Sequence, residues 1–143
     1  MKMKPIYLGR HVYGLAAIGF GLTTLVWRDF NIWQQIRALG NVSHREILVY
    51  IAAAIELAGG LAIQWHKTAR AGALALGALY LTFALLWVPQ IIATPLLYDR
   101  WGNFFEQFSL VSGALIVYAT AGSDWEQDTK MARIGYVCFG VCV

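Results

Sequence analysis

Long apolar stretches alternate with short polar connections along this chain. Four of the stretches are apolar over about 20 residues, the length that an α-helix needs to cross a bilayer core of roughly 30 Å. The third contains no Asp, Glu, Lys or Arg between Ala71 and Tyr98. The pattern therefore predicts four transmembrane helices, over residues 6–27, 46–65, 70–93 and 104–122.

Short motifs indicate where these helices begin and end. Ser43 and Glu46 have the spacing of a capping box, in which a hydroxyl group and a carboxylate bind backbone amides of the first helical turn. Asn103 and Glu106 repeat this layout before the fourth stretch. Pro89 lacks an amide hydrogen and its ring clashes with the preceding turn, so we expect it to end or kink the third helix.

The connection between the first two predicted helices has its own periodicity. It contains large apolar residues at helical spacing, namely Phe30, Trp33, Ile36 and Leu39. This spacing predicts one of two structures over residues 30–39: a short amphipathic helix in the membrane interface, or a loop anchored by aromatic side chains.

The C-terminal segment resembles the start of the first predicted helix. Arg133-Ile-Gly-Tyr136 has the spacing of Arg10-His-Val-Tyr13. Only about 10 apolar residues follow, or about 15 Å of helix, which is too short to span a bilayer. We expect a partial helix over residues 131–143 that either packs at the interface or marks the chain as a shortened form of a longer, duplicated protein.

The composition excludes a soluble domain. Hydrophobic residues make up 59% of the 143 residues and charged residues 13%, whereas soluble domains average about 45–50% and about 25%. The prediction is a single all-α membrane domain over residues 1–143, a four-transmembrane-helix bundle with a short extra C-terminal helix, whose first partner is the lipid bilayer. The cationic residues form no basic stripe, so we expect no nucleic-acid partner.

The distribution of positive charge predicts the orientation, because cytoplasmic loops are enriched in Lys and Arg. With four spans, one side of the membrane would carry seven cationic residues: Lys2, Lys4, Arg10, Lys67, Arg70, Lys130 and Arg133. The other side would carry four: Arg28, Arg37, Arg45 and Arg100. We therefore expect both termini in the cytoplasm.

Glu56 is the most informative residue of the sequence, because it lies midway along the second predicted helix. A charged group at that depth costs several kcal/mol, so Glu56 should face the interior of the bundle with a partner, or be protonated. Tyr80, Thr82 and Ser112 lie at similar depth on other helices and are the candidate partners. Glu56 is then either a proton-linked or quinone-headgroup contact, or a neutral group that joins helices.

Arg10 and Glu106 are secondary candidates for a functional site. Arg10 lies near the inner end of the first helix, where snorkelling toward lipid headgroups also explains it. The capping-box position accounts for Glu106 without any activity. No His or Cys pair has metal-ligand spacing within a span, so we expect no metal site, and catalysis by this chain alone is not indicated.

Several of these residues resemble the DoxX-like family of integral membrane proteins. The resemblance lies in Leu8-Gly-Arg10, in Glu56-Leu-Ala-Gly-Gly-Leu-Ala62 with the following Thr68-Ala-Arg-Ala71, and in Asn103-Phe-Phe-Glu106. The resemblance implies a four-helix bundle. It also implies a redox role, because some members of that family are membrane subunits of thiosulfate:quinone oxidoreductase and others are linked to redox complexes that handle oxidative stress. It also implies Glu56 and Arg10 as candidate site residues.

Three functional hypotheses follow. The first is a DoxX-like protein of a bacterial inner membrane that contacts quinone, or is non-catalytic, within a redox complex. The second is a proton-linked carrier of a small solute, which would require a homo-oligomer because four helices leave little room for a water-filled path. The third is a structural membrane bundle without catalytic activity.

Overall fold

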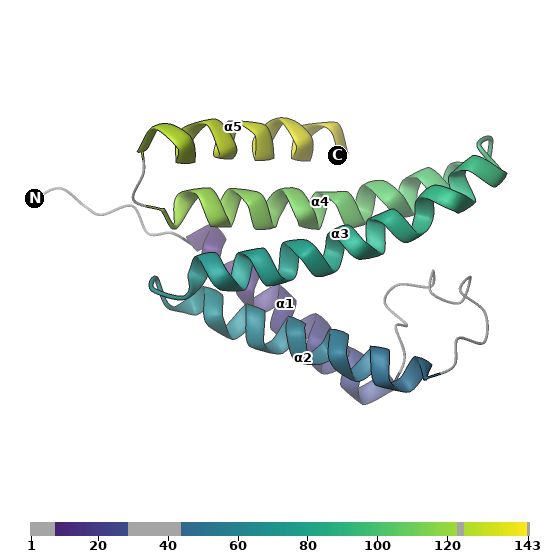
Figure 1. Ribbon diagram of the computed structural model, residues 1–143, viewed down its shortest axis with the longest axis horizontal. Helices are drawn as coiled ribbons and strands as arrows, with labels where there is room; N and C mark the ends of the chain where they lie inside the picture. Colours follow the sequence, from purple (N-terminus) through teal and green to yellow (C-terminus); the bar gives the residue numbers. More distant parts are fainter. Residues whose placement is uncertain (1–7, 29–43, 123–124, 143) are drawn as a thin grey trace, which may run out of the picture.

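The apolar stretches form long α-helices, which a computed structural model describes over residues 8–28, 44–122 and 125–142, without the side chains of 125–128 (Figure 1). Within these residues there are five helices: α1 (Leu8–Trp27), α2 (Arg45–Gln64), α3 (Ala69–Ala93), α4 (Tyr98–Thr120) and α5 (Trp125–Cys142). The all-α prediction is therefore confirmed for the described part of the chain.

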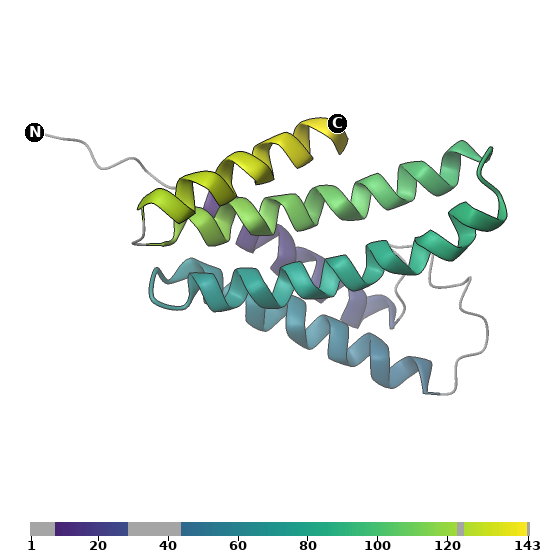
Figure 2. The same cartoon turned by 45° about the horizontal axis from the view of Figure 1, so that its top comes forward.

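Helices that follow one another in the sequence also pack against one another (Figures 1 and 2). α2 lies between α1 and α3, α3 packs along α4, and α5 packs along the other side of α4. A smaller contact joins α1 to α4 through Tyr13, whose hydroxyl group donates to the carbonyl oxygen of Leu110 at 2.8 Å. The first four helices enclose a buried core: Ala17, Val49, Ala52, Ile63, Ala73, Leu76, Tyr80, Phe83 and Val117.

Glycines bring the backbones of α1, α2 and α3 into contact. A Cβ atom added to Gly60 of α2 would lie 2.6 Å from the carbonyl oxygen of Gly14 of α1. A Cβ atom added to Gly72 of α3 would lie 2.6 Å from the carbonyl oxygen of Gly59 of α2. Small residues at helix interfaces permit this close approach in lipid. α2 is thus fixed between two neighbours by glycine contacts.

Two of the described helices, α2 and α3, are long and apolar enough to cross a membrane by length and composition. This finding is compatible with a membrane location, and the count of four spans stays a prediction. In both helices, 39% of the most apolar window is buried inside the protein. The rest of each window is partly or fully exposed.

The start of α4 differs from the prediction. α4 begins at Tyr98 and not at residue 104, so Asn103 and Glu106 lie inside the helix and form no capping box. The helix begins earlier because the indole N–H of Trp101 donates to the carbonyl oxygen of Pro95 at 2.9 Å and anchors the first turn.

The end of α3 is set by a different proline from the one expected. α3 continues through Pro89 to Ala93, so Pro89 does not end the helix. The residue that follows is Thr94, which leaves the helical conformation. The ring of Pro95 disfavours the helical conformation of the residue before it, and this explains the boundary.

The start of α2 also differs in its cap. α2 begins at Arg45, and His44 before it has a left-handed φ of 72° with no capping hydrogen bond from its side chain. Ser43, the predicted cap, lies outside the described residues, as does the predicted interfacial helix over residues 30–39.

The C-terminal helix is longer than the predicted segment 131–143. α5 has 18 residues, or about 27 Å of helix. A search for apolar residues misses its start, because the residues before Met131 are mostly polar, although several have good helix propensity. Gly135 allows α5 to approach α4, since a Cβ atom there would lie 2.7 Å from Cγ1 of Ile116.

The glycine contacts predict opposite effects for two Gly→Ala substitutions. Gly60→Ala should lower the melting temperature in detergent, because its methyl group would meet the carbonyl oxygen of Gly14 at 2.6 Å and such overpacking costs about 1–3 kcal/mol. Gly19→Ala is the matched control, since no described atom lies within 4 Å of its Cβ position. It should raise stability by about 0.5–1 kcal/mol. Thermal melts followed by circular dichroism test this, and equal shifts in both variants would contradict it.

Candidate functional site

Glu56 is the one carboxyl group that is buried among the described residues, with 1% of its surface exposed. It shares the inward face of α2 with Gly59, Gly60 and Ile63, which follow it at helical spacing. Thr24 of α1 is buried opposite, and its hydroxyl group donates to Oε2 of Glu56 at 3.4 Å. Thr24 was not among the predicted partners of Glu56, which all belong to the third and fourth predicted helices.

Of the predicted partners on α3, the structure brings Tyr80 inward and leaves Thr82 outside. Tyr80 is 1% exposed and belongs to the buried core. Thr82 is exposed and donates to the carbonyl oxygen of Ala78 on its own helix at 2.8 Å. Residues two apart point to nearly opposite sides of a helix, so an inward Tyr80 places Thr82 on the outer surface.

The structure gives the remaining predicted residues other surroundings. Ser112 is buried, but its hydroxyl group donates to the carbonyl oxygen of Phe108 on its own helix at 2.9 Å. Glu106 is exposed on α4. Arg10 is half-buried near the start of α1, where its Nη2 atom lies 3.5 Å from Nε2 of His11.

Gln107 is a buried polar residue that was not among the predicted site residues. Its side chain is fully buried, with 0% exposure. Among the described residues, neither its amide nitrogen nor its amide oxygen has a hydrogen-bond partner. A buried polar group without a partner costs about 1–3 kcal/mol. The only signal in the sequence is a polar residue in an apolar stretch, and it is weak because Gln107 carries no charge, unlike neighbouring Glu106.

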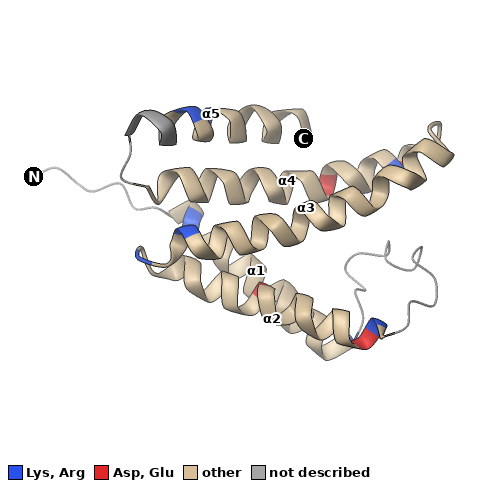
Figure 3. Ribbon diagram, viewed as in Figure 1, with Lys and Arg blue, Asp and Glu red and all other residues tan. Residues whose placement is uncertain are grey.

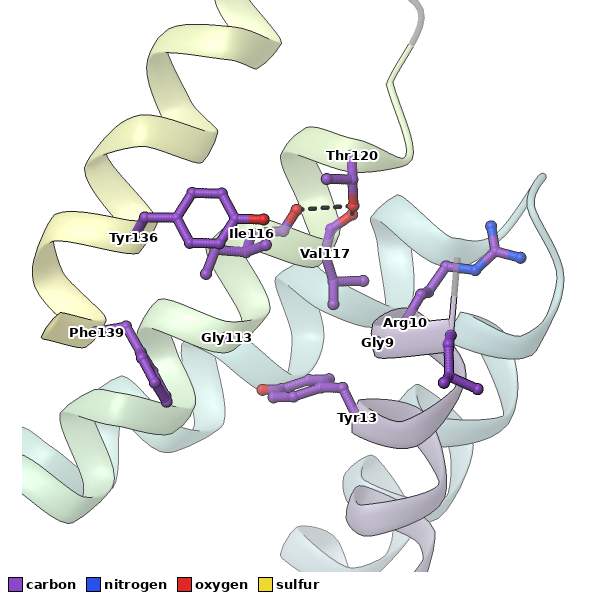
Figure 4. Close-up of a pocket in the computed structure, with 10 residues that line it drawn as sticks. Gly9, Arg10, Tyr13, Gly113, Ile116, Val117, Thr120, Tyr136 and Phe139 are labelled. Carbon is purple, nitrogen blue, oxygen red and sulfur yellow. Dashed lines mark hydrogen bonds between the residues drawn. The ribbon is translucent and has the colours of Figure 1, made fainter. Parts of the chain in front are cut away.

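A cavity of about 390 Å³ lies between α1, α4 and α5 (Figure 4). The ring of Tyr13 forms its floor and fits against Gly113, where a Cβ atom would lie 2.8 Å from Cε2 of the ring. Tyr136 and Phe139 of α5 form the opposite wall. Arg10 lies at the edge of the cavity on the α1 side, and its guanidinium group points away from the rings of Tyr13, Tyr136 and Phe139 (Figure 4).

The cavity combines apolar walls with a few polar groups. This combination and its volume are typical of small-molecule sites, which measure about 300–1,000 Å³. The guanidinium group of Arg10 offers hydrogen-bond donors and positive charge. Glu56 and Tyr80 are not among the lining residues. The described residues contain no cluster of three His, Cys, Asp or Glu side chains that could hold a metal ion.

The different surroundings of Gln107 and Gln64 predict opposite effects of Gln→Met substitutions on the melting temperature. Gln107→Met should raise the melting temperature, because it removes an amide that has no partner among the described residues and restores about 1–3 kcal/mol. Gln64→Met should lower it, because Oε1 of Gln64 lies 2.8 Å from Nδ1 of His11 and joins α2 to α1. Thermal melts in one detergent compare the two variants. A loss of stability in Gln107→Met as large as in Gln64→Met would show that Gln107 has a partner.

The chain has no match among protein-family models, curated proteins or solved structures.

Proposed function

We propose that this chain is a non-catalytic subunit of a redox system and binds a quinone in the cavity between α1, α4 and α5. The observation that carries the proposal is the cavity itself, with aromatic and aliphatic walls and Arg10 at its edge. The proposal includes a multi-pass location in a bacterial inner membrane with both termini in the cytoplasm.

The outer surface of the helices supports the membrane location. Large apolar side chains are exposed along α2, including Ile47, Leu48, Ile51 and Leu61. Similar residues are exposed on α1 and α3, for example Leu15, Leu22, Leu74 and Leu85. Soluble monomers rarely expose contiguous apolar patches larger than a few hundred Å². A hydrocarbon environment removes the cost of this exposure.

The chemistry of a quinone fits the cavity. A quinone headgroup is a flat ring with two carbonyl oxygens that accept hydrogen bonds, and its tail is apolar. Tyr13, Tyr136 and Phe139 supply aromatic surface. Arg10 would supply donors for one carbonyl oxygen by turning its guanidinium group inward from the position that Figure 4 shows. No residue lining the cavity is a carboxylate, so acceptors for a proton released from a quinol would come from elsewhere.

Glu56 has a separate role in this proposal. It joins α1 to α2 through Thr24, and α1 in this position brings Tyr13 to α4. Its burial is also the one observation that favours the alternative function, a proton-linked carrier of a small solute. In that case, liposomes containing the protein would take up solute when a pH gradient is applied.

The proposal predicts that quinone retention depends on Arg10. Arg10→Met should reduce the quinone that copurifies with the protein about tenfold or more, since hydrogen bonds to charged groups contribute about 1.5–3 kcal/mol. Arg133→Met is the matched control, because Arg133 is exposed and does not line the cavity. Solvent extraction and chromatography of the bound quinone measure both variants.

Equal quinone content in wild type, Arg10→Met and Arg133→Met would contradict the proposal. Glu56→Gln extends the test, because Glu56 lies outside the cavity lining. It should leave quinone content near the wild-type value. Loss of quinone in Glu56→Gln alone would move the site to the interior around Glu56.

A further inference from the structure

A second cavity lies between α3 and α4 on the outside of the bundle, and α5 closes one side of it. It has a volume of about 370 Å³. Its walls include Ala73, Gly77 and Ala78 of α3, Ala114 and Leu115 of α4, and Met131 of α5. Its lining on α3 extends from residue 73 to residue 81, or about 12 Å along the helix axis. We call it the α3–α4 groove.

A cationic group lies at one end of this groove. Tyr118 lines the groove, and the guanidinium carbon of Arg70 lies 4.9 Å from the centre of its ring. Lys67 is exposed in the turn before α3, and Lys130 is exposed beside Met131. Figure 3 shows that Lys and Arg gather at the end of the bundle where α3 begins.

The described acidic side chains lie elsewhere in the bundle. They are Glu46, Glu56, Asp99 and Glu106, which belong to α2 and to the first half of α4. Asp124, Glu126 and Asp128 fall outside the described side chains. Among the described residues, the groove therefore has a positively charged end and an apolar body.

We propose that the α3–α4 groove binds one acyl chain of an anionic phospholipid, whose phosphate is held by Arg70 with Lys67 and Lys130. The apolar body matches the hydrocarbon chain, and the charged end matches the headgroup. Basic residues beside membrane helices attract anionic lipids in this way. The proposal depends on the membrane location and is independent of quinone binding.

The size of the groove favours a lipid chain over a protein segment. An α-helix is about 10–12 Å wide with its side chains, so a whole helix does not fit within the groove. An extended acyl chain is much thinner. Gly77 lies where α3 and α4 approach closely, since a Cβ atom there would lie 3.3 Å from Cβ of Ala114, and the small side chain of exposed Ala78 leaves the outer side of the groove open. These dimensions favour a single acyl chain, and a dimer in the native mass spectrum that lipid dissociates would instead indicate a second copy of this protein.

Native mass spectrometry in detergent tests the proposal with phosphatidylglycerol and phosphatidylcholine of identical acyl chains. We expect the full chain to bind one phosphatidylglycerol at least fivefold more tightly than phosphatidylcholine. Arg70→Gln should weaken phosphatidylglycerol binding about fivefold, the effect of one cationic residue near the membrane surface. Arg70→Lys should keep the preference, and Arg28→Gln, at the other end of the bundle, should change nothing.

A second pair of variants tests the apolar body of the groove. Ala78→Phe fills it and should weaken binding of both lipids. Ala75→Phe is the matched control, because Ala75 is exposed on the same helix but does not line the groove. Circular dichroism verifies that each variant is helical. If a variant of one pair fails to fold, the other pair still tests lipid binding to the groove.

Several results would overturn the proposal. They are equal binding of the two lipids, equal effects of Arg70→Gln and Arg28→Gln, or equal effects of Ala78→Phe and Ala75→Phe. Competition by free glycerol phosphate as effective as by the intact lipid would show a phosphate site without an acyl-chain groove. Quinone content measured in the same samples separates the two proposals. If the wild-type protein retains quinone but does not prefer phosphatidylglycerol, only the proposal of a lipid in the α3–α4 groove is contradicted.

Discussion

Backbone contact between α1, α2 and α3 is the constraint on which the remaining structure depends. Gly14 meets Gly60 on one side of α2, and Gly59 meets Gly72 on the other. In the proposed membrane location, lipid would supply no hydrophobic force to press helices together, so close packing of small residues would hold them. These contacts fix how α2 is rotated about its axis, and this rotation decides that Glu56 faces inward beside Thr24.

The same rotation determines where binding sites can form. Because α1 is held against α2, its Tyr13 reaches across to α4 at Leu110 and Gly113. The space left between α1, α4 and α5 is the cavity with Arg10 at its edge. The polar interior and the cavity are therefore separate features. The interior groups connect helices, whereas the cavity has the volume and the lining of a ligand site.

Hydropathy was sufficient to predict the first four helices, because each contains a long, mostly apolar stretch. It also identified Glu56, since a carboxyl group in such a stretch is conspicuous in the sequence. Thr82 could not be separated from Tyr80 by depth alone, because depth carries no information on rotation about the helix axis. The start of α4 depends on the contact between Trp101 and Pro95, which no local motif shows.

Helix α5 shows a further limit of the sequence. Its first residues are mostly polar, so hydropathy does not predict a helix there. The helix packs against α4, where Gly135 lies close to Ile116. With α5 in place, both the cavity between α1, α4 and α5 and the α3–α4 groove acquire a wall. Both sites extend toward the end of the bundle where basic residues gather (Figure 3), which places them beside lipid headgroups in the proposed orientation.

The central claim is that a quinone occupies the cavity between α1, α4 and α5. Photo-crosslinking with an azido-quinone, followed by mass spectrometry of the labelled peptides, tests it most directly. The account predicts labels on Tyr13 and on Tyr136 or Phe139, with unlabelled quinone competing for both. Labels confined to the peptide that contains Glu56, or labelling that excess quinone does not reduce, would contradict it.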